Sequence, residues 1–171
     1  MEVTSVNQER ISKEMHELEG IIGYTFRDVS RLADAMRSVL LDPREGDGKN
    51  NREYANDARA CLGDTIVKCL IAKHLFDQDK RKGEITEEKA KLESNKVLHR
   101  ITTEYHISDY AYNEEYFAKD DPPQHKRVRS ESHDPYVEAI TAAIFLDGGW
   151  EAVDAWFRKW LLPRLEQHKP S

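Results

Sequence analysis

The sequence predicts an all-α fold, a multi-helix single domain over residues 1–171 with its core at about 18–162 and polar tails at both ends. Apolar residues recur at spacings of three and four along nearly the whole chain, which is the pattern of amphipathic helices. A chain of 171 residues suits one compact domain. Hydrophobic residues make up 39% of it, and no apolar run approaches the ~20 residues of a membrane-spanning helix.

Three helices are expected before residue 80. Apolar positions at 11–22 predict the first, which Gly23 ends. A second is expected at 32–40, stopping near Pro43 at a loop rich in Gly, Asp and Asn. The third and longest spans 58–76.

Three more helical segments are expected after residue 80. Thr86 is the expected N-cap of a helix that reaches residue 101, with an interruption near 94–95. A helix at 135–146 is expected to end at the Asp-Gly-Gly run that follows it. The last helix covers 153–161, and Pro163 is expected to close it.

Charge and cysteine content narrow the function classes. The net charge of -6 argues against binding nucleic acid over the whole surface and leaves a local basic patch as the relevant feature. Cys61 and Cys69 lie on one predicted helix, roughly 12 Å apart along its axis and too far to bridge. We expect both to pack in the core, and we expect an intracellular, reducing compartment.

Five segments, in order, resemble the ribonuclease III catalytic domain between about Leu18 and Leu162. They are GYTF at 23–26, NDARACLGD at 56–64, GEIT at 83–86, SNKVL at 94–98 and EAITAAIFLDGG at 138–149. Each is short, but their order over this length is specific. The resemblance implies the ribonuclease III endonuclease-domain fold and a role on double-stranded RNA.

The resemblance also implies phosphodiester hydrolysis by Mg²⁺ held between carboxylates, since the metal polarises phosphate oxygens and supplies hydroxide. Two of the four acid positions of the family pattern retain an acid, as Asp64 and Glu138. Ala60 and Pro135 occupy the other two. We therefore expect weak Mg²⁺ binding or none, and lost or strongly reduced cleavage.

Neighbouring residues compensate only in part for the two missing acids. Asp134 adjoins Pro135 and could turn toward the site, although capping of the following helix is the favoured interpretation. Glu138 lies among apolar residues and is expected to be partly buried, where an acid needs a partner or a metal. Asp64 could also be an ordinary solvated carboxylate on a long helix.

Members of the family pair through the signature helix, where an aromatic residue of each enters its partner. Cys61 stands at the position that usually carries Phe, so this anchor is diminished. Ala58, Cys61 and Leu62 still form an apolar face. A homodimer with different packing is expected.

Duplex RNA is contacted mainly at phosphates and 2′-hydroxyls. The candidate contacts are two basic groups, which could also be ordinary solvated charge. The second precedes Glu138 in a polar stretch at 113–132 and could border the cleft. Because the sequence ends at Ser171, we expect no separate double-stranded-RNA-binding domain. The two groups are Lys80, Arg81 and Lys82, and then Lys126, Arg127 and Arg129.

Three hypotheses follow, and the sequence leaves the enzyme assignment open between them. The leading one is a divergent ribonuclease III-domain protein that binds double-stranded RNA in RNA processing with a degraded site. The alternative is an active Mg²⁺-dependent endonuclease using Asp64, Glu138 and Asp134. The third is a non-catalytic scaffold that binds protein partners in a ribonucleoprotein.

Overall fold

The structure is a computed structural model that describes residues 5–39, 41, 53–113 and 134–171. Within these ranges the regular elements are helical, which confirms the all-α prediction, and an isolated backbone bridge joins Arg37 to Tyr112. The predicted loop at 43–51, nearly all of the polar stretch at 113–132, and Lys126, Arg127 and Arg129 lie outside the described residues.

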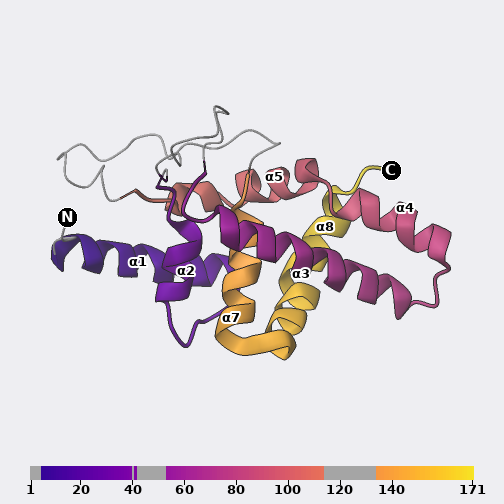
Figure 1. The fold of residues 1–171 in the computed structure, drawn as a ribbon, viewed down its shortest axis with the longest axis horizontal. Helices are drawn as coiled ribbons and strands as arrows, with labels where there is room; N and C mark the ends of the chain where they lie inside the picture. Colours follow the sequence, from indigo (N-terminus) through magenta and orange to yellow (C-terminus); the bar gives the residue numbers. More distant parts are fainter. Residues whose placement is uncertain (1–4, 40, 42–52, 114–133) are drawn as a thin grey trace, which may run out of the picture.

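The described chain forms seven α-helices, one 3₁₀ turn (η1) and one π-helical turn (η3), shown in Figure 1. Within the described ranges, every helix is too short or too polar to span a membrane. The elements in order are α1 (Ser5–Ile22), α2 (Ser30–Met36), α3 (Asp57–Phe76), α4 (Lys82–Leu92), α5 (Asn95–Glu104), η1 (Ile107–Tyr110), α7 (Tyr136–Trp156), η3 (Phe157–Leu161) and α8 (Leu162–His168).

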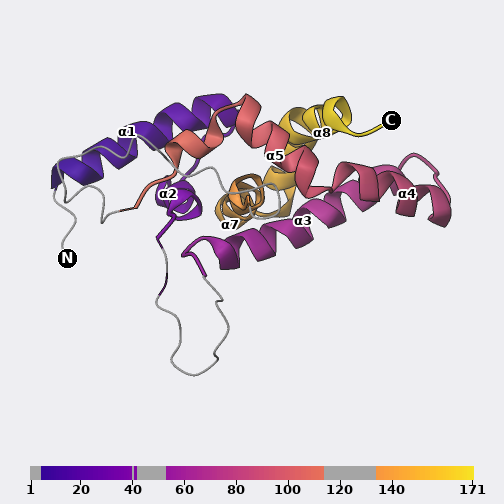
Figure 2. The same cartoon turned by 90° about the horizontal axis from the view of Figure 1, so that it is seen from above.

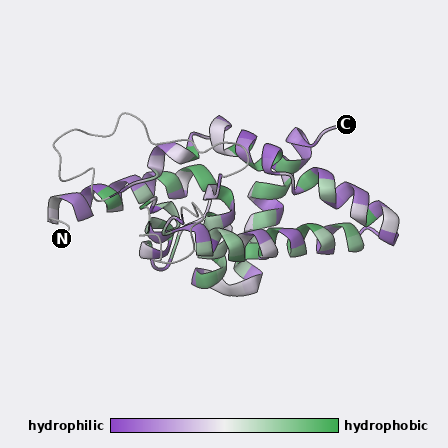
Figure 3. Ribbon diagram, turned by 45° about the horizontal axis from the view of Figure 1, so that its top comes forward, coloured by the Kyte–Doolittle hydropathy of each residue, from purple (hydrophilic) through white to green (hydrophobic). Residues whose placement is uncertain are grey.

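Helix α7 lies at the centre of the fold. It packs chiefly against α3 and α2, and the view from above shows it nearly end-on beside α2, with α3 on one side and α5 on the other (Figure 2). Its first three turns are buried on almost every side, from Tyr136 to Ile144. A helix that is apolar all round requires neighbours all round, which explains its place. Hydrophilic residues instead dominate α1 and α4 at the ends of the molecule (Figure 3).

Several predicted boundaries were wrong, because a tertiary backbone contact follows the end of α2 and local capping sets the start of α4. Helix α2 ends at Met36, after which Ser38 donates its backbone N–H to the Tyr112 carbonyl at 2.8 Å. Helix α4 begins at Lys82, so Thr86 lies inside it and donates its hydroxyl to the Lys82 carbonyl. The predicted interruption is confirmed, since Ser94 caps α5 by accepting the Val97 N–H.

The C-terminal region also differs from the prediction. The expected stop after residue 146 is a sharp bend at Gly149, whose φ of +78° suits glycine, visible where α7 turns at the base of Figure 1. Pro163 does not close the last helix, because it lies in the first turn of α8, where its missing N–H costs no helical hydrogen bond. Leu165, beyond it, is fully buried.

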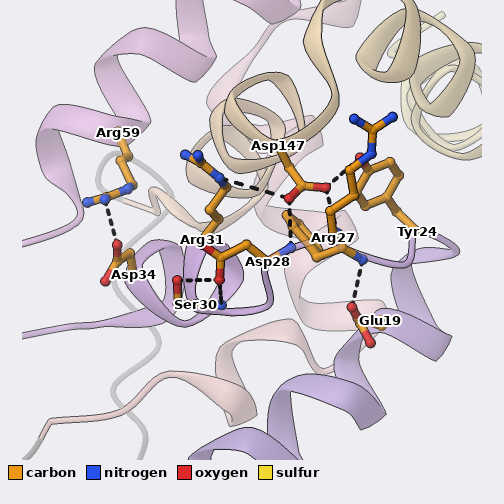
Figure 4. Close-up of polar contacts among 10 residues, drawn as sticks. Glu19, Tyr24, Arg27, Asp28, Ser30, Arg31, Asp34, Arg59 and Asp147 are labelled. Atoms are coloured by element: carbon orange, nitrogen blue, oxygen red, sulfur yellow. Dashed lines mark hydrogen bonds and ion pairs between the residues drawn. The ribbon is translucent and has the colours of Figure 1, made fainter.

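Asp147 anchors the bend to the segment after α1. Its carboxylate accepts the Tyr24 hydroxyl at 2.9 Å and the backbone N–H groups of Arg27 and Asp28 at 2.9 and 3.0 Å, with Arg31 3.9 Å away (Figure 4). Burial opposes ionisation of Asp147, but these donors prevail and hold its pKa below the usual range. The side chain is only 1% exposed, so this carboxylate has a structural role.

The crossing of α3 and α7 is the closest helix contact in the site region. A Cβ atom added at Gly63 would lie 1.7 Å from the carbonyl oxygen of Glu138. Only glycine allows the two backbones to approach this closely. The crossing therefore sets the distance between Asp64, which follows Gly63, and Glu138.

We predict that Gly63→Ala destabilises the protein by about 3 kcal/mol, since α3 and α7 must separate to admit the methyl group. Urea denaturation measures the change. Gly20→Ala is the matched control, because Gly20 also lies in a helix but has open space around it. The control should be neutral or stabilising, by about 0.5–1 kcal/mol. Equal stability of Gly63→Ala and the parent would contradict the close crossing.

Candidate functional site

A polar cavity of about 440 Å³ lies between α3 and the start of α7, next to the first residue of α5. Four carboxyl-bearing residues and one lysine are among those that line it. The lining residues are Asp57, Ala60, Cys61, Asp64, Lys68, Asn95, Asp134, Pro135 and Glu138. The structure thus brings together all four positions that the sequence resemblance assigned to metal ligands.

The local helix geometry explains this convergence. Ala60 and Asp64 are four residues apart on α3 and face the same side of the helix. Gly63, directly before Asp64, contacts the backbone of Glu138, so the two remaining acids are held beside each other. Ala60 is 7% exposed and Pro135 is buried, and neither contributes an oxygen ligand from its side chain.

Lys68 lines the cavity, and the sequence analysis did not identify it. Its ammonium donates a hydrogen bond to Asp64 Oδ2 at 2.7 Å, and the two side chains are 42% and 36% exposed. The signal was present in the sequence, because Asp and Lys four residues apart on a helix form an ion pair. The contact with Asp64 raises the pKa of Lys68, so the lysine is positively charged.

Glu138 is the most perturbed acid of the site. Burial, followed by the negative charge of Asp64 and a hydrogen bond to that carboxylate, raises the pKa of Glu138 to about 8. At neutral pH Glu138 is therefore largely protonated and donates to Asp64. The predicted partial burial of Glu138 is confirmed.

Asp134 is engaged on both oxygens. Oδ1 accepts the backbone N–H of Tyr136 at 3.2 Å at the start of α7, and Oδ2 lies 3.0 Å from His99 Nδ1. Burial raises the pKa of Asp134, while the contacts with His99 and Tyr136 oppose the shift. These contacts agree with the favoured interpretation of Asp134 as a helix-start residue and do not favour its service as a third catalytic acid.

The donors present fit a divalent metal poorly. Mg²⁺ requires hard oxygen ligands in octahedral geometry, usually from ionised carboxylates and waters. Here Asp64 is paired with Lys68, and Glu138 carries a proton near neutral pH. Over the described ranges, no group of three or more His, Cys, Asp or Glu side chains is arranged to hold a metal ion.

The other predicted contact residues lie on α3 and just beyond it. Ala58, Cys61 and Leu62 are exposed on the first turns of α3. Cys69 is exposed as well, so the prediction that both cysteines pack in the core was wrong. The reason is that α3 turns another face, which includes Ile66 and Leu70, toward the rest of the protein.

The basic group of Lys80, Arg81 and Lys82 follows α3 and ends at the first residue of α4. Arg81 and Lys82 are exposed, and Lys80 is half-buried. The group follows the end of α3 at Phe76, which is roughly 18 Å along the helix from Asp64. It does not line the cavity.

Comparison with known proteins places the chain in a family. The family model described as the ribonuclease III domain matches residues 58–149, more than half of the chain. The protein called ribonuclease 3 in Oleidesulfovibrio alaskensis is 30% identical over 80% of this chain, and its counterpart in Chloroflexus aurantiacus is 30% identical over 92%. The nuclease domain of ribonuclease III from Campylobacter jejuni shares the fold, with a TM-score of 0.63 and 21% identity over 90% of this chain and 96% of that one.

This chain therefore belongs to the ribonuclease III domain family. It spans 57% of the length of the Oleidesulfovibrio relative and 63% of the Chloroflexus relative. The predicted family and fold are confirmed.

We predict that Glu138 makes the protein less stable as pH rises from about 4.5 to about 8, because the folded state keeps a proton that the unfolded state releases. Glu138→Gln should abolish this slope and stabilise the protein at pH 9 by roughly 2–4 kcal/mol. Thermal unfolding across this pH range measures both effects. Glu151→Gln, at an exposed position of the same helix, is the matched control and should leave the slope unchanged. A carbon-13 NMR midpoint for Glu138 near 4.5 would contradict the assignment.

Proposed function

We propose that this chain is a divergent ribonuclease III domain that binds double-stranded RNA in RNA processing and has lost, or strongly reduced, endonuclease activity. The observation that carries the proposal is the cavity at Asp64 and Glu138, in which Ala60 and Pro135 stand at the family's other acid positions. Two acids hold a metal for in-line attack less firmly than four do. The two free cysteines favour an intracellular location.

Retention of the fold around this cavity supports a surviving role on RNA. Double-stranded RNA is recognised largely by shape and by its phosphates, neither of which requires the missing acids. The exposed side chains of Arg81 and Lys82 are available for such contacts, and Lys126, Arg127 and Arg129 are proposed as the second group. A scaffold that binds only protein partners is the competing role.

We also propose that the chain forms a homodimer through the start of α3. Ala58, Cys61 and Leu62 are exposed there, with Leu62 at 39%, so a second copy has an apolar face to cover. One Campylobacter jejuni structure is described as showing flexibility in the region of that domain involved in dimer formation. A partner at this face would lie beside the cavity, because Cys61 also lines it.

For cleavage, we expect the purified chain to leave long duplex RNA intact in Mg²⁺ or Mn²⁺, because the cavity lacks the ligands to position a metal. Gel analysis over a time course measures the products. The Asp64→Asn/Glu138→Gln variant, prepared identically, reports contaminating nuclease. Products from the parent that the variant does not generate would overturn the proposed loss of activity and support the active-enzyme alternative.

For RNA binding, we expect the affinity for duplex RNA to fall steeply with salt, because binding to phosphates releases counterions. Replacing Lys126, Arg127 and Arg129 with Gln should weaken binding and lower the salt slope by roughly one for each phosphate that is no longer neutralised. Fluorescence anisotropy measures both quantities.

The control for RNA binding is Arg158→Gln/Lys159→Gln, which removes exposed basic side chains from η3. This variant should bind as the parent does. Absence of any salt slope in the parent, or equal weakening by both variants, would contradict specific RNA contacts and favour the scaffold.

A further inference from the structure

The cavity that ribonuclease III enzymes use for divalent metal already contains a positive charge of this protein's own. Lys68 Nζ lies 2.7 Å from Asp64 Oδ2. Among the described residues that line the cavity, Lys68 alone carries a positive side chain, facing the acidic residues Asp57, Asp64, Asp134 and Glu138. A lysine ammonium placed among carboxylates reduces the repulsion between them, as a bound cation also does.

Hydrogen bonds already occupy several carboxylate oxygens of the cavity. Both oxygens of Asp134 have protein partners, and Asp57 Oδ2 accepts the backbone N–H of Tyr54 at 2.7 Å. Asp64 Oδ2 accepts from Lys68. A metal ion at Asp64 would therefore have to displace the ammonium or bind beside it, against the repulsion between the two positive charges.

A second pair on the same helix shows what distinguishes Lys68 from an ordinary surface lysine. Lys73 and Asp77 are also four residues apart on α3 and its C-cap, and their atoms also lie 2.7 Å apart. Lys73 does not line the cavity, whereas Lys68 lines it together with Asp64 and Glu138. The position of Lys68 in the cavity, rather than its ion pair alone, is thus what distinguishes it.

We propose that the Lys68 ammonium takes the place of the metal ion in this cavity, so that the acid remnant is neutralised internally and takes up neither Mg²⁺ nor Mn²⁺. This inference accompanies the proposed loss of cleavage, but it is a separate claim about metal binding in the absence of RNA. It assigns Asp64 to an ion pair with Lys68 within α3, on the wall of the cavity that faces the start of α7.

Mn²⁺ binding to the full chain, measured by the loss of the free-ion electron paramagnetic resonance signal, tests the proposal. The parent should show no saturable site in the cavity. Lys68→Met should acquire one, with Mn²⁺ uptake on the order of tenfold or more above the parent's at the same free Mn²⁺, because it removes a like charge beside Asp64. Lys73→Met is the matched control and should behave as the parent does. Adding Asp64→Asn to Lys68→Met should abolish the new site.

Two results would overturn the proposal: a saturable Mn²⁺ site in the parent that Asp64→Asn removes, or a folded Lys68→Met chain that gains no site. A measurement on the parent alone covers the case in which Lys68→Met does not fold. Mn²⁺ added to the isotope-labelled parent should not selectively broaden the amide signals of Asp64, Lys68 and Glu138, and selective broadening there would sink the idea. Cleavage of RNA is measured separately, so a chain that binds RNA yet takes up Mn²⁺ refutes only this inference.

Discussion

The contact between Gly63 and the backbone of Glu138 is the constraint on which the site depends. Because Gly63 has no Cβ atom, α3 and α7 can cross more closely than two helices with side chains between them. The crossing places Asp64 and Glu138, which are far apart in sequence, at one cavity. Nearly every feature of the site follows from bringing these two acids together.

Two carboxyl groups at one partly buried site repel each other unless something neutralises them. In this chain the protein supplies the neutralisation itself. Glu138 retains a proton to a higher pH than usual and shares it with Asp64, while Lys68 pairs with the other side of Asp64. Asp134 accepts the Tyr136 N–H at the start of α7 and lies within hydrogen-bond distance of His99. The cavity is thus stable as a structural site without relying on the ligand set that metal catalysis requires.

The remainder of the fold keeps α7 in the position that this crossing needs. Its far end is fixed where Asp147 accepts hydrogen bonds from Tyr24 and from the backbone after α1. Beyond the bend, the indole N–H groups of Trp156 and Trp160 donate to the carbonyls of Ile22 and Ile21 at the end of α1. The end of α1 and the segment after it therefore contact the chain on both sides of the bend, which restrains the C-terminal part of the central helix.

Periodicity and local motifs were enough to predict the helical class, the family, the long α3 helix and the positions at which acids remain or are missing. These features are properties of residues that are close together along the chain. Helix ends were less predictable because competing caps lay within a few residues of each other, as with Arg81 and Thr86. The exposure of Cys61 and Cys69 required knowledge of which face of α3 packs inward, and periodicity alone does not supply it.

The protonation and hydrogen bonding of the remaining acids, in contrast, depended mainly on how the helices pack together. Asp64 and Lys68 are neighbours on one helix, so their pairing was accessible in principle from their spacing. The proton on Glu138 and the engagement of Asp134 by His99 were not, since each depends on burial and on charges from another helix. Sequence places carboxylates along a chain, whereas their ionisation depends on the three-dimensional surroundings that folding creates.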